Sequence, residues 1–226
     1  MNTTLYLDIE TIPSQKAGVL DDIRANITAP AKLSKPESIA AWLAGPEKEA
    51  AAQEAYRKTA LNGTMGEVVC IGWAINDGPV NFFCRALGGS ESKMLQDFFA
   101  AVNSATSSAP LWVGHNIIGF DLRFLYQRAV INSVNPLMSL PHDTRYNGKE
   151  VYDTMLAWAG WGNRVSLKNL CAALDVPVKE GDIDGSKVWD YVQAGKILEV
   201  AEYCRHDVEA TREAYHRMTF DAHRSR

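Results

Sequence analysis

The sequence predicts an α/β protein with a mixed central sheet flanked by helices, and two observations carry that prediction. Three strand-like segments follow one another early in the chain, which is typical of an antiparallel meander. Segments of helical spacing then alternate with short apolar runs, which is typical of parallel strands joined by helices. The 226 residues, of which 46% are hydrophobic and 22% charged, suffice for one core, so we expect a single domain over 1–226.

Strands are expected at 4–9, 68–75 and 80–86, with the turn Asn76-Asp77-Gly78-Pro79 before the third. The run 90–101 has the apolar period of a helix behind a Ser cap, and 111–113 reads as a short buried strand. The remaining expected elements are a strand or helix start near 151–153 and helices at about 121–130, 166–174 and 197–218.

A polar segment at about 28–62 interrupts the first two strands and predicts a helical insertion of two short helices. It carries several lysines and arginines that could grip a nucleic-acid strand. Acids are interspersed with these bases, however, which indicates a solvated helical face.

The charge balance of 23 Lys+Arg against 27 Asp+Glu gives a formal net charge of −4, which argues against binding nucleic acid by bulk electrostatics. It does not exclude a nuclease, because divalent cations can bridge an acidic site to phosphate. The four cysteines form no CxxC pair and read as reduced core thiols. With neither a signal peptide nor a long apolar run, we expect a cytoplasmic protein that makes no membrane contact.

Asp8 and Glu10 lie two residues apart in the first predicted strand, so both carboxylates leave the same face of the sheet. Acids at the end of a strand are often simply solvated. Here they replace apolar residues in an otherwise hydrophobic strand, which is costly unless a metal ion compensates.

The segment Gly114-His115-Asn116-Ile117-Ile118-Gly119-Phe120-Asp121 precedes a predicted helix. Taken alone, Asp121 is a typical N-cap. The functional alternative is that the glycines allow a ligand to approach the backbone closely, while Asn116 offers its amide to a sugar or base.

Tyr203 and Asp207 lie four residues apart on one face of the last predicted helix. Such a pair is ordinary in any helix. Its weight comes from the other two segments, because all three bring carboxylates to places that can converge.

Together the residues LDIET, GHNIIGFD and YCRHD resemble the three motifs of the DEDD exonucleases, in the subgroup with Tyr in the third motif. The resemblance is to the proofreading 3′–5′ exonuclease domain of family B DNA polymerases and its stand-alone relatives. It covers residue 5 to about 215, and no polymerase region follows, so a free-standing nuclease is expected.

The resemblance implies a ribonuclease H-like fold and hydrolysis with two divalent cations, Mg²⁺ or Mn²⁺. It implies that Asp8 bridges both ions, that Glu10 and Asp207 complete the site of the water-activating ion, and that Asp121 serves the other ion. Tyr203 would hydrogen-bond the attacking water.

Several other polar and aromatic residues have two interpretations. Asp153 and Ser166 read as helix caps, with a supporting role near the site as the alternative for Asp153. Arg164, Lys168 and Asn169 could meet phosphates. Three tryptophans could stack on bases, although packing is the commoner fate of such residues: Trp158, Trp161 and Trp189.

The leading hypothesis is a 3′–5′ exonuclease that shortens single-stranded DNA and releases 5′ mononucleotides. An exoribonuclease trimming RNA 3′ ends needs the same acids, and the sequence does not separate the two. A catalytically inactive nucleic-acid-binding subunit is disfavoured, because such a protein has no reason to retain four costly acids. An endonuclease of the same fold is disfavoured by the Tyr-Asp pairing of the third motif.

Overall fold

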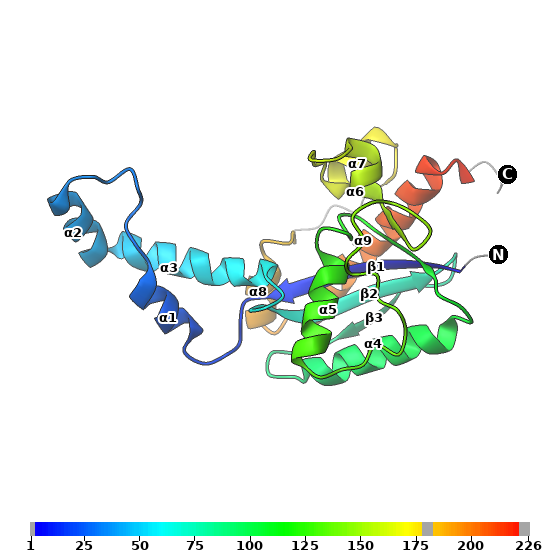
Figure 1. Ribbon diagram of the computed structural model, residues 1–226, viewed down its shortest axis with the longest axis horizontal. Coiled ribbons are helices and arrows are strands. Elements are labelled where there is room, and N and C mark those ends of the chain that lie inside the picture. The colour runs from blue at the N-terminus through cyan, green and yellow to red at the C-terminus, as the bar shows by residue number, and fades with distance from the viewer. Residues whose placement is uncertain (1–2, 178–182, 222–226) are drawn as a thin grey trace.

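The computed structural model describes residues 3–177 and 183–221 of the chain (Figure 1). Its sheet has the strand order β3-β2-β1-β4-β5, with antiparallel pairing of β1 to β2 and β2 to β3, and parallel pairing of β1 to β4 and β4 to β5. The mixed sheet and the antiparallel meander that the sequence predicted are therefore confirmed. The strands are β1 (Thr4–Ile12), β2 (Glu67–Ile75), β3 (Asn81–Cys84), β4 (Leu111–Gly114) and β5 (Val151–Asp153).

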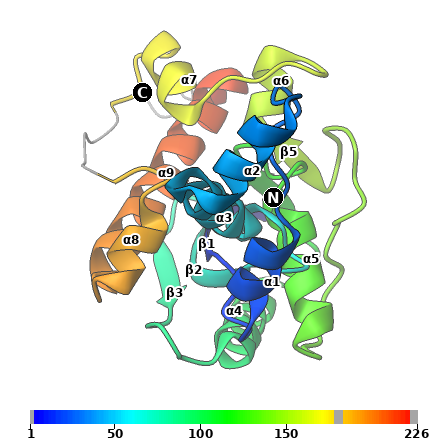
Figure 2. The ribbon, with the colours of Figure 1, turned by 90° about the vertical axis from the view of Figure 1, so that its left-hand side faces the viewer.

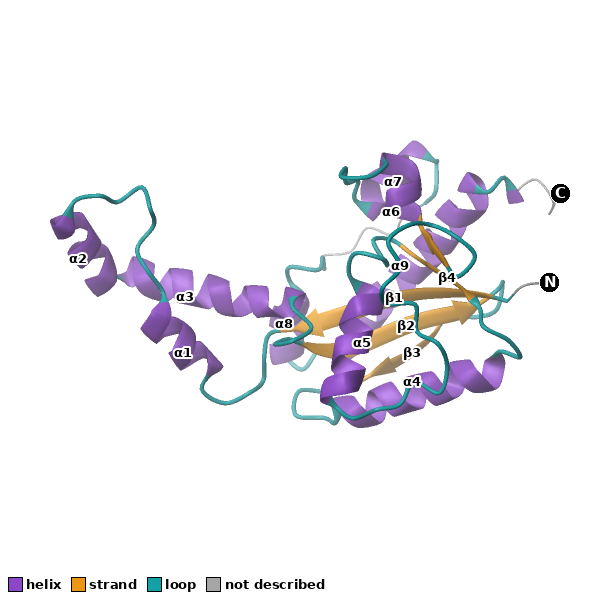
Figure 3. Ribbon diagram, in the orientation of Figure 1, coloured by secondary structure: helices purple, strands orange, loops and turns teal. Residues whose placement is uncertain are grey.

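Helices cover both faces of the sheet and extend beyond its end (Figure 3). The last helix has the bounds that the sequence predicted, and α6 begins directly after Asp153, as the capping interpretation of that residue predicted, whereas the short helices α1 and α8 were not expected. The helices are α1 (Val19–Asn26), α2 (Pro36–Ala44), α3 (Pro46–Lys58), the 3₁₀ turn η1 (Thr59–Leu61), α4 (Glu91–Ala105), α5 (Asp121–Ile131), α6 (Thr154–Ala159), α7 (Leu167–Ala173), α8 (Val188–Gln193) and α9 (Ile197–Met218).

The alternation of β1 divides the core between two faces. Leu5, Leu7 and Ile9 pack in one cluster with apolar residues of α4 and α5, such as Phe98. Tyr6 packs on the opposite face, in a cluster that includes residues of α9. Because side chains alternate along a strand, Asp8 and Glu10 share the face of Tyr6 and lie under α9.

A buried ion pair joins the helices of the first face to the sheet. Arg128 of α5 donates to Glu91 at the start of α4, with the Nη2 and Oε2 atoms 2.6 Å apart. Glu91 Oε1 also accepts the N–H of Val68 on β2 at 2.7 Å. The carboxylate is therefore satisfied on several sides, as a buried charge requires.

The helical insertion begins earlier than the expected 28–62 segment, because α1 already lies within it. The insertion extends away from the end of the sheet (Figure 1), so in a view along that direction α1, α2 and α3 lie in front of the sheet (Figure 2). Arg24 on α1 makes two hydrogen bonds of 2.8 Å to Glu49 on α3, which ties the helices together. Among the described residues, no helix combines the length and apolarity needed to cross a membrane.

Candidate metal centre and active site

Asp8 and Glu10 stand next to each other beneath α9, as their spacing predicted. Ligand atoms of Asp8, Glu10 and Cys204 lie within 4.8 Å of one another. Glu10 is only 7% exposed. Burial raises the pKa values of the Asp8 and Glu10 carboxyls well above their ordinary values, and the charges of neighbouring acids raise both pKa values further.

One oxygen of Asp8 lacks a partner. Its Oδ2 atom is buried and accepts no hydrogen bond from the described residues. A buried carboxylate oxygen without a partner costs free energy, which a proton or a cation bound to that oxygen would offset.

Asp121 reaches the same centre from α5. Its Oδ1 accepts the N–H of Ile9, the residue between Asp8 and Glu10, at 3.2 Å. Burial raises the pKa of Asp121 to about 7. The N-cap of α5 is Phe120, so the interpretation of Asp121 as the capping residue is wrong: its side chain points to β1 instead of closing its own helix.

Tyr203 and Asp207 enter from α9, one turn apart. The Tyr203 hydroxyl lies beside the Asp207 carboxylate and lowers its pKa, but burial outweighs this effect and raises the pKa of Asp207 to about 6. Burial, followed by the charges of Asp207, Glu10 and Asp8, raises the pKa of Tyr203 well above its ordinary value. The phenol therefore stays protonated and acts as a hydrogen-bond donor in this centre.

A close approach of α9 to the sheet makes this convergence sterically feasible. Gly72 on β2 pairs with Asp8 in the strand register. A Cβ atom at Gly72 would lie 2.8 Å from Cys204 Sγ, so a larger residue would push the helix outwards. Cys204 Sγ also donates to the Asp8 carbonyl at 3.4 Å, which fixes the helix over the acidic pair. Sequence reasoning missed this role, since Cys204 appeared only as one of four cysteines interpreted as reduced core thiols.

The loop that carries Asn116 follows β4 and is held by Asp153 at the end of β5. Asp153 Oδ1 accepts the N–H of Asn116 at 3.0 Å, and its Oδ2 accepts that of Ile118 at 3.1 Å. Asp153 also caps α6, by accepting the N–H groups of Met155 and Leu156. The capping interpretation of Asp153 is therefore right, and the residue supports the site loop as well. Ser166 likewise caps α7, as predicted.

The four acids have no basic counterpart. Within the described ranges 3–177 and 183–221, no lysine or arginine forms an ion pair with Asp8, Glu10, Asp121 or Asp207. Carboxylate oxygens are the ligands that Mg²⁺ and Mn²⁺ prefer. The donor set and the unpartnered Asp8 oxygen thus fit divalent cations.

Residues 61–224 match the model of a protein family described as a predicted 3′-5′ exonuclease related to the exonuclease domain of PolB. The chain belongs to this family. No curated protein sequence matches it. Among solved structures, the chain is similar to the family B DNA polymerase of the archaeon Pyrobaculum calidifontis, with a TM-score of 0.55 and 17% identity over 96% of this chain and 24% of that one. The fold is thus that of the polymerase exonuclease domain.

In this exonuclease-family chain, the family match contains Asn116, Asp121, Tyr203 and Asp207. Asp8 and Glu10 precede it, and β1 brings them to the other acids. The three segments therefore meet through the fold, not through proximity along the chain.

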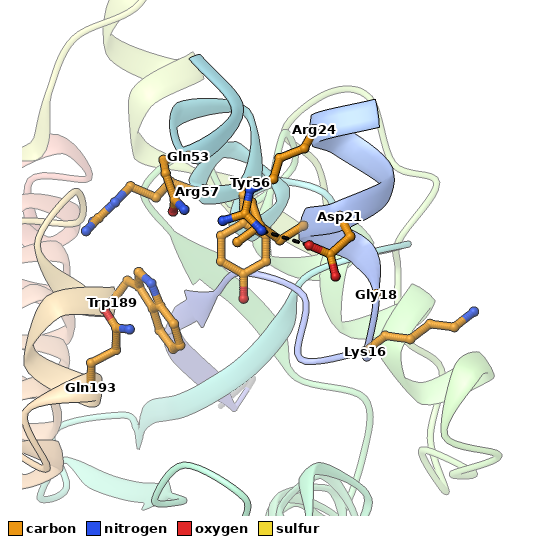
Figure 4. Close-up of a pocket in the computed structure, with 10 residues that line it drawn as sticks. Lys16, Gly18, Asp21, Arg24, Gln53, Tyr56, Arg57, Trp189 and Gln193 are labelled. Carbon is orange, nitrogen blue, oxygen red and sulfur yellow. Dashed lines mark hydrogen bonds and ion pairs between the residues drawn. The ribbon is translucent and has the colours of Figure 1, made fainter. Parts of the chain in front are cut away.

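The family member also has a hollow of about 480 Å³ between its helical insertion and α8 (Figure 4). Tyr56 and Trp189 line it, but its guanidinium groups are already paired. Arg24 binds Asp21 and Glu49, and Arg57 lies 2.5 Å from Asp190. This pairing favours the solvated interpretation of the insertion over a strand-gripping one.

Proposed function

We propose that the protein is a 3′–5′ exonuclease that hydrolyses single-stranded DNA from its 3′ end and releases 5′ mononucleotides. The observation that carries this proposal is the convergence of four carboxylates from β1, α5 and α9, with which no lysine or arginine of the described residues forms an ion pair. Membership of the exonuclease family supports the reaction, and the choice of DNA over RNA rests on the resemblance to polymerase proofreading domains.

Asp8, Glu10, Asp121 and Asp207 would hold two divalent ions, Mg²⁺ or Mn²⁺. Such ions supply a nucleophilic hydroxide at neutral pH and stabilise charge on the leaving 3′ oxygen. Tyr203, protonated and next to Asp207, is suited to orient the attacking water. Asn116, on a loop that Asp153 holds in place, would contact the terminal sugar.

The proposal is tested with a 5′-labelled single strand incubated with Mg²⁺ or Mn²⁺. We expect a descending ladder that disappears in EDTA, because shortening proceeds one nucleotide at a time. A 3′-phosphate should block it, since added negative charge meets carboxylates, and a circular strand should resist cleavage. Duplex DNA should be slower, because unpairing its end costs a few kcal/mol.

The controls separate this activity from a contaminant and from the alternatives. Asp207→Asn should abolish the ladder, whereas Asp22→Asn on the exposed side of α1 should not. Efficient cutting of the circle would indicate an endonuclease. If RNA with the same 5′ label is degraded much faster than DNA, the substrate of the proposal becomes RNA. DNA and RNA strands that both keep their full length with Mg²⁺ and with Mn²⁺ would contradict the exonuclease proposal.

A further inference from the structure

Two exposed aromatic rings lie against each other on the surface near the site loop. Tyr146 is 65% exposed and Trp161 is 69% exposed, and their ring centroids are 5.5 Å apart at an interplanar angle of 40°. Trp161 is one of the three tryptophans for which packing and base stacking were the two interpretations, and its ring is not packed in the core. Large exposed rings cost free energy in water, so a neighbouring pair of them indicates a surface that binds something flat and apolar.

The chain around Trp161 keeps its ring in this exposed position. Trp161 lies between Gly160 and Gly162, whose φ angles are 78° and 79°. Only glycine adopts this conformation without strain, so the turn is specific to the Gly-Trp-Gly sequence. Gly160 ends α6 by donating its N–H to Leu156 at 3.0 Å, which anchors the turn to a helix.

Hydrogen bonds connect the two segments that carry the rings to the residues around Asn116. On one side, Asn147 next to Tyr146 accepts the N–H of Asp153 at 2.7 Å and donates to the Asp153 carbonyl at 3.1 Å. On the other side, His115 Nε2 lies 2.9 Å from the Val165 carbonyl oxygen and its Nδ1 lies 3.0 Å from Thr154 Oγ1. The rings therefore belong to segments that are hydrogen-bonded to the candidate active site.

Cations flank the rings and are available to phosphates. Arg145, Lys149 and Arg164 are exposed and lie within three residues of Tyr146 or Trp161, and none has an ion pair with the described residues. The acids Asp143 and Glu150 are exposed in the same segment, so the local net charge is small. Stacking would supply most of the attraction, with the bases contacting the sugar-phosphate backbone.

We propose that Tyr146 and Trp161 form a stacking platform for the single strand on the 5′ side of its reacting end. This inference rests on the proposed function, since it adds a binding site for the remainder of the same substrate. Stacking tolerates any base, as a processive end-trimming enzyme requires. The platform explains why rings are displayed beside a site whose own charge is negative and therefore repels phosphates in the absence of cations.

The test compares a long substrate with one too short to reach the platform. We expect the variant Tyr146→Ala/Trp161→Ala to bind a 5′-fluorescent oligothymidylate at least about tenfold more weakly, since base stacking on a ring has an effect of this size. Hydrolysis of the p-nitrophenyl ester of thymidine 5′-monophosphate, which offers only the reacting group, should keep the parent rate. The single variant Trp161→Phe, which keeps an aromatic ring at this position, should retain most of the parent's affinity for the oligonucleotide. Phe82→Ala is the matched control, because Phe82 is 44% exposed on β3, at the opposite edge of the sheet from β5.

Binding is measured with Asp207→Asn in the background, so that the strand is not degraded. If ring removal weakens oligonucleotide binding as expected but the parent hydrolyses neither substrate, the platform is supported and the exonuclease proposal fails. If ring removal leaves oligonucleotide affinity unchanged, or weakens it no more than Phe82→Ala does, the platform is overturned while the exonuclease proposal stands. A dimer of the parent that separates on ring removal would also overturn it, since the rings would then contact a second copy.

The flanking bases give an independent readout. Arg145→Gln, Lys149→Gln and Arg164→Gln combined should reduce the slope of log affinity against log salt by about 2, if each cation releases about 0.7 of a counterion from a single strand. An unchanged slope would show that these cations do not contact phosphate and would contradict their part in the platform.

Discussion

Asp8 lies beneath α9 with one carboxylate oxygen buried and lacking a hydrogen-bond partner among the described residues. Asp207 lies on α9 beside the Tyr203 hydroxyl, one turn away on the same helix. Both groups repel each other when ionised and attract a cation, so they favour metal binding at the expense of the metal-free fold. Removing a carboxylate of this kind should therefore stabilise the metal-free protein.

We therefore expect Asp8→Asn and Asp207→Asn each to reduce exonuclease activity to below about 1% of the parent, because a ligand to the ions is lost. In metal-free buffer the same variants should be more stable than the parent, by about 1 to 3 kcal/mol in the free energy of unfolding. Denaturant titration in EDTA measures the stability. Near-normal turnover by either variant would remove that residue from the metal site.

Tyr203→Phe removes the hydroxyl and keeps the ring, so it tests the role of the hydroxyl alone. The ring packs beside a core cluster that includes Val200 and Cys204, so the fold should be retained. Loss of the hydroxyl should lower the rate about 10²-fold, because a positioned proton-handling group contributes about this much. Isothermal titration with Mn²⁺ should show nearly parental affinity. A parental rate across pH and metal concentration would mean that Tyr203 serves only in packing.

The packing of α9 on β2 depends on Gly72, which faces Cys204 without an intervening Cβ. Gly72→Ala should destabilise the protein by about 1–3 kcal/mol through overpacking, and it should also lower the rate by moving Tyr203 and Asp207 away from Asp8. Gly185→Ala is a suitable control, because a Cβ there meets no atom within 4 Å. If activity falls equally in Gly72→Ala and Gly185→Ala, the position of α9 does not control the rate.

Among the helices, the sequence predicted those in which the apolar periodicity extends over many residues or the capping residue is clear. The helix of Tyr203 and the capped helix behind Ser90 are examples, and the side-chain oxygen of Ser90 does accept the N–H of Lys93. The short helix α8 was missed, since six residues show too little of a period. The spacing of Asp8 and Glu10 predicted their shared face. Their distance from Cys204 could not be predicted, because it depends on how closely a helix approaches a glycine in another strand.

The molecule as a whole couples its folding to protons through the acidic centre, and the proposed function adds a coupling to metal ions at the same residues. Burial raises the pKa of Asp121 to about 7 and that of Asp207 to about 6, against ordinary values of 3.8. The native metal-free protein thus binds more protons than the unfolded chain between about pH 4 and 7. The free energy of unfolding must then fall as pH rises through this window. His115 makes the free energy of unfolding rise with pH, because burial lowers its pKa. This single group opposes the contributions of several acids.

We expect the melting temperature in EDTA to decrease from pH 5 to pH 7.5, and Mg²⁺ or Mn²⁺ to raise it most at the upper end, where protons no longer compete for the carboxylates. Differential scanning fluorimetry across this range, with and without metal, measures both effects. The double variant Asp121→Asn/Asp207→Asn should flatten the slope in EDTA and abolish the metal response. A melting temperature that rises with pH in EDTA, or a metal response that survives the double variant, would place the cation elsewhere in the protein.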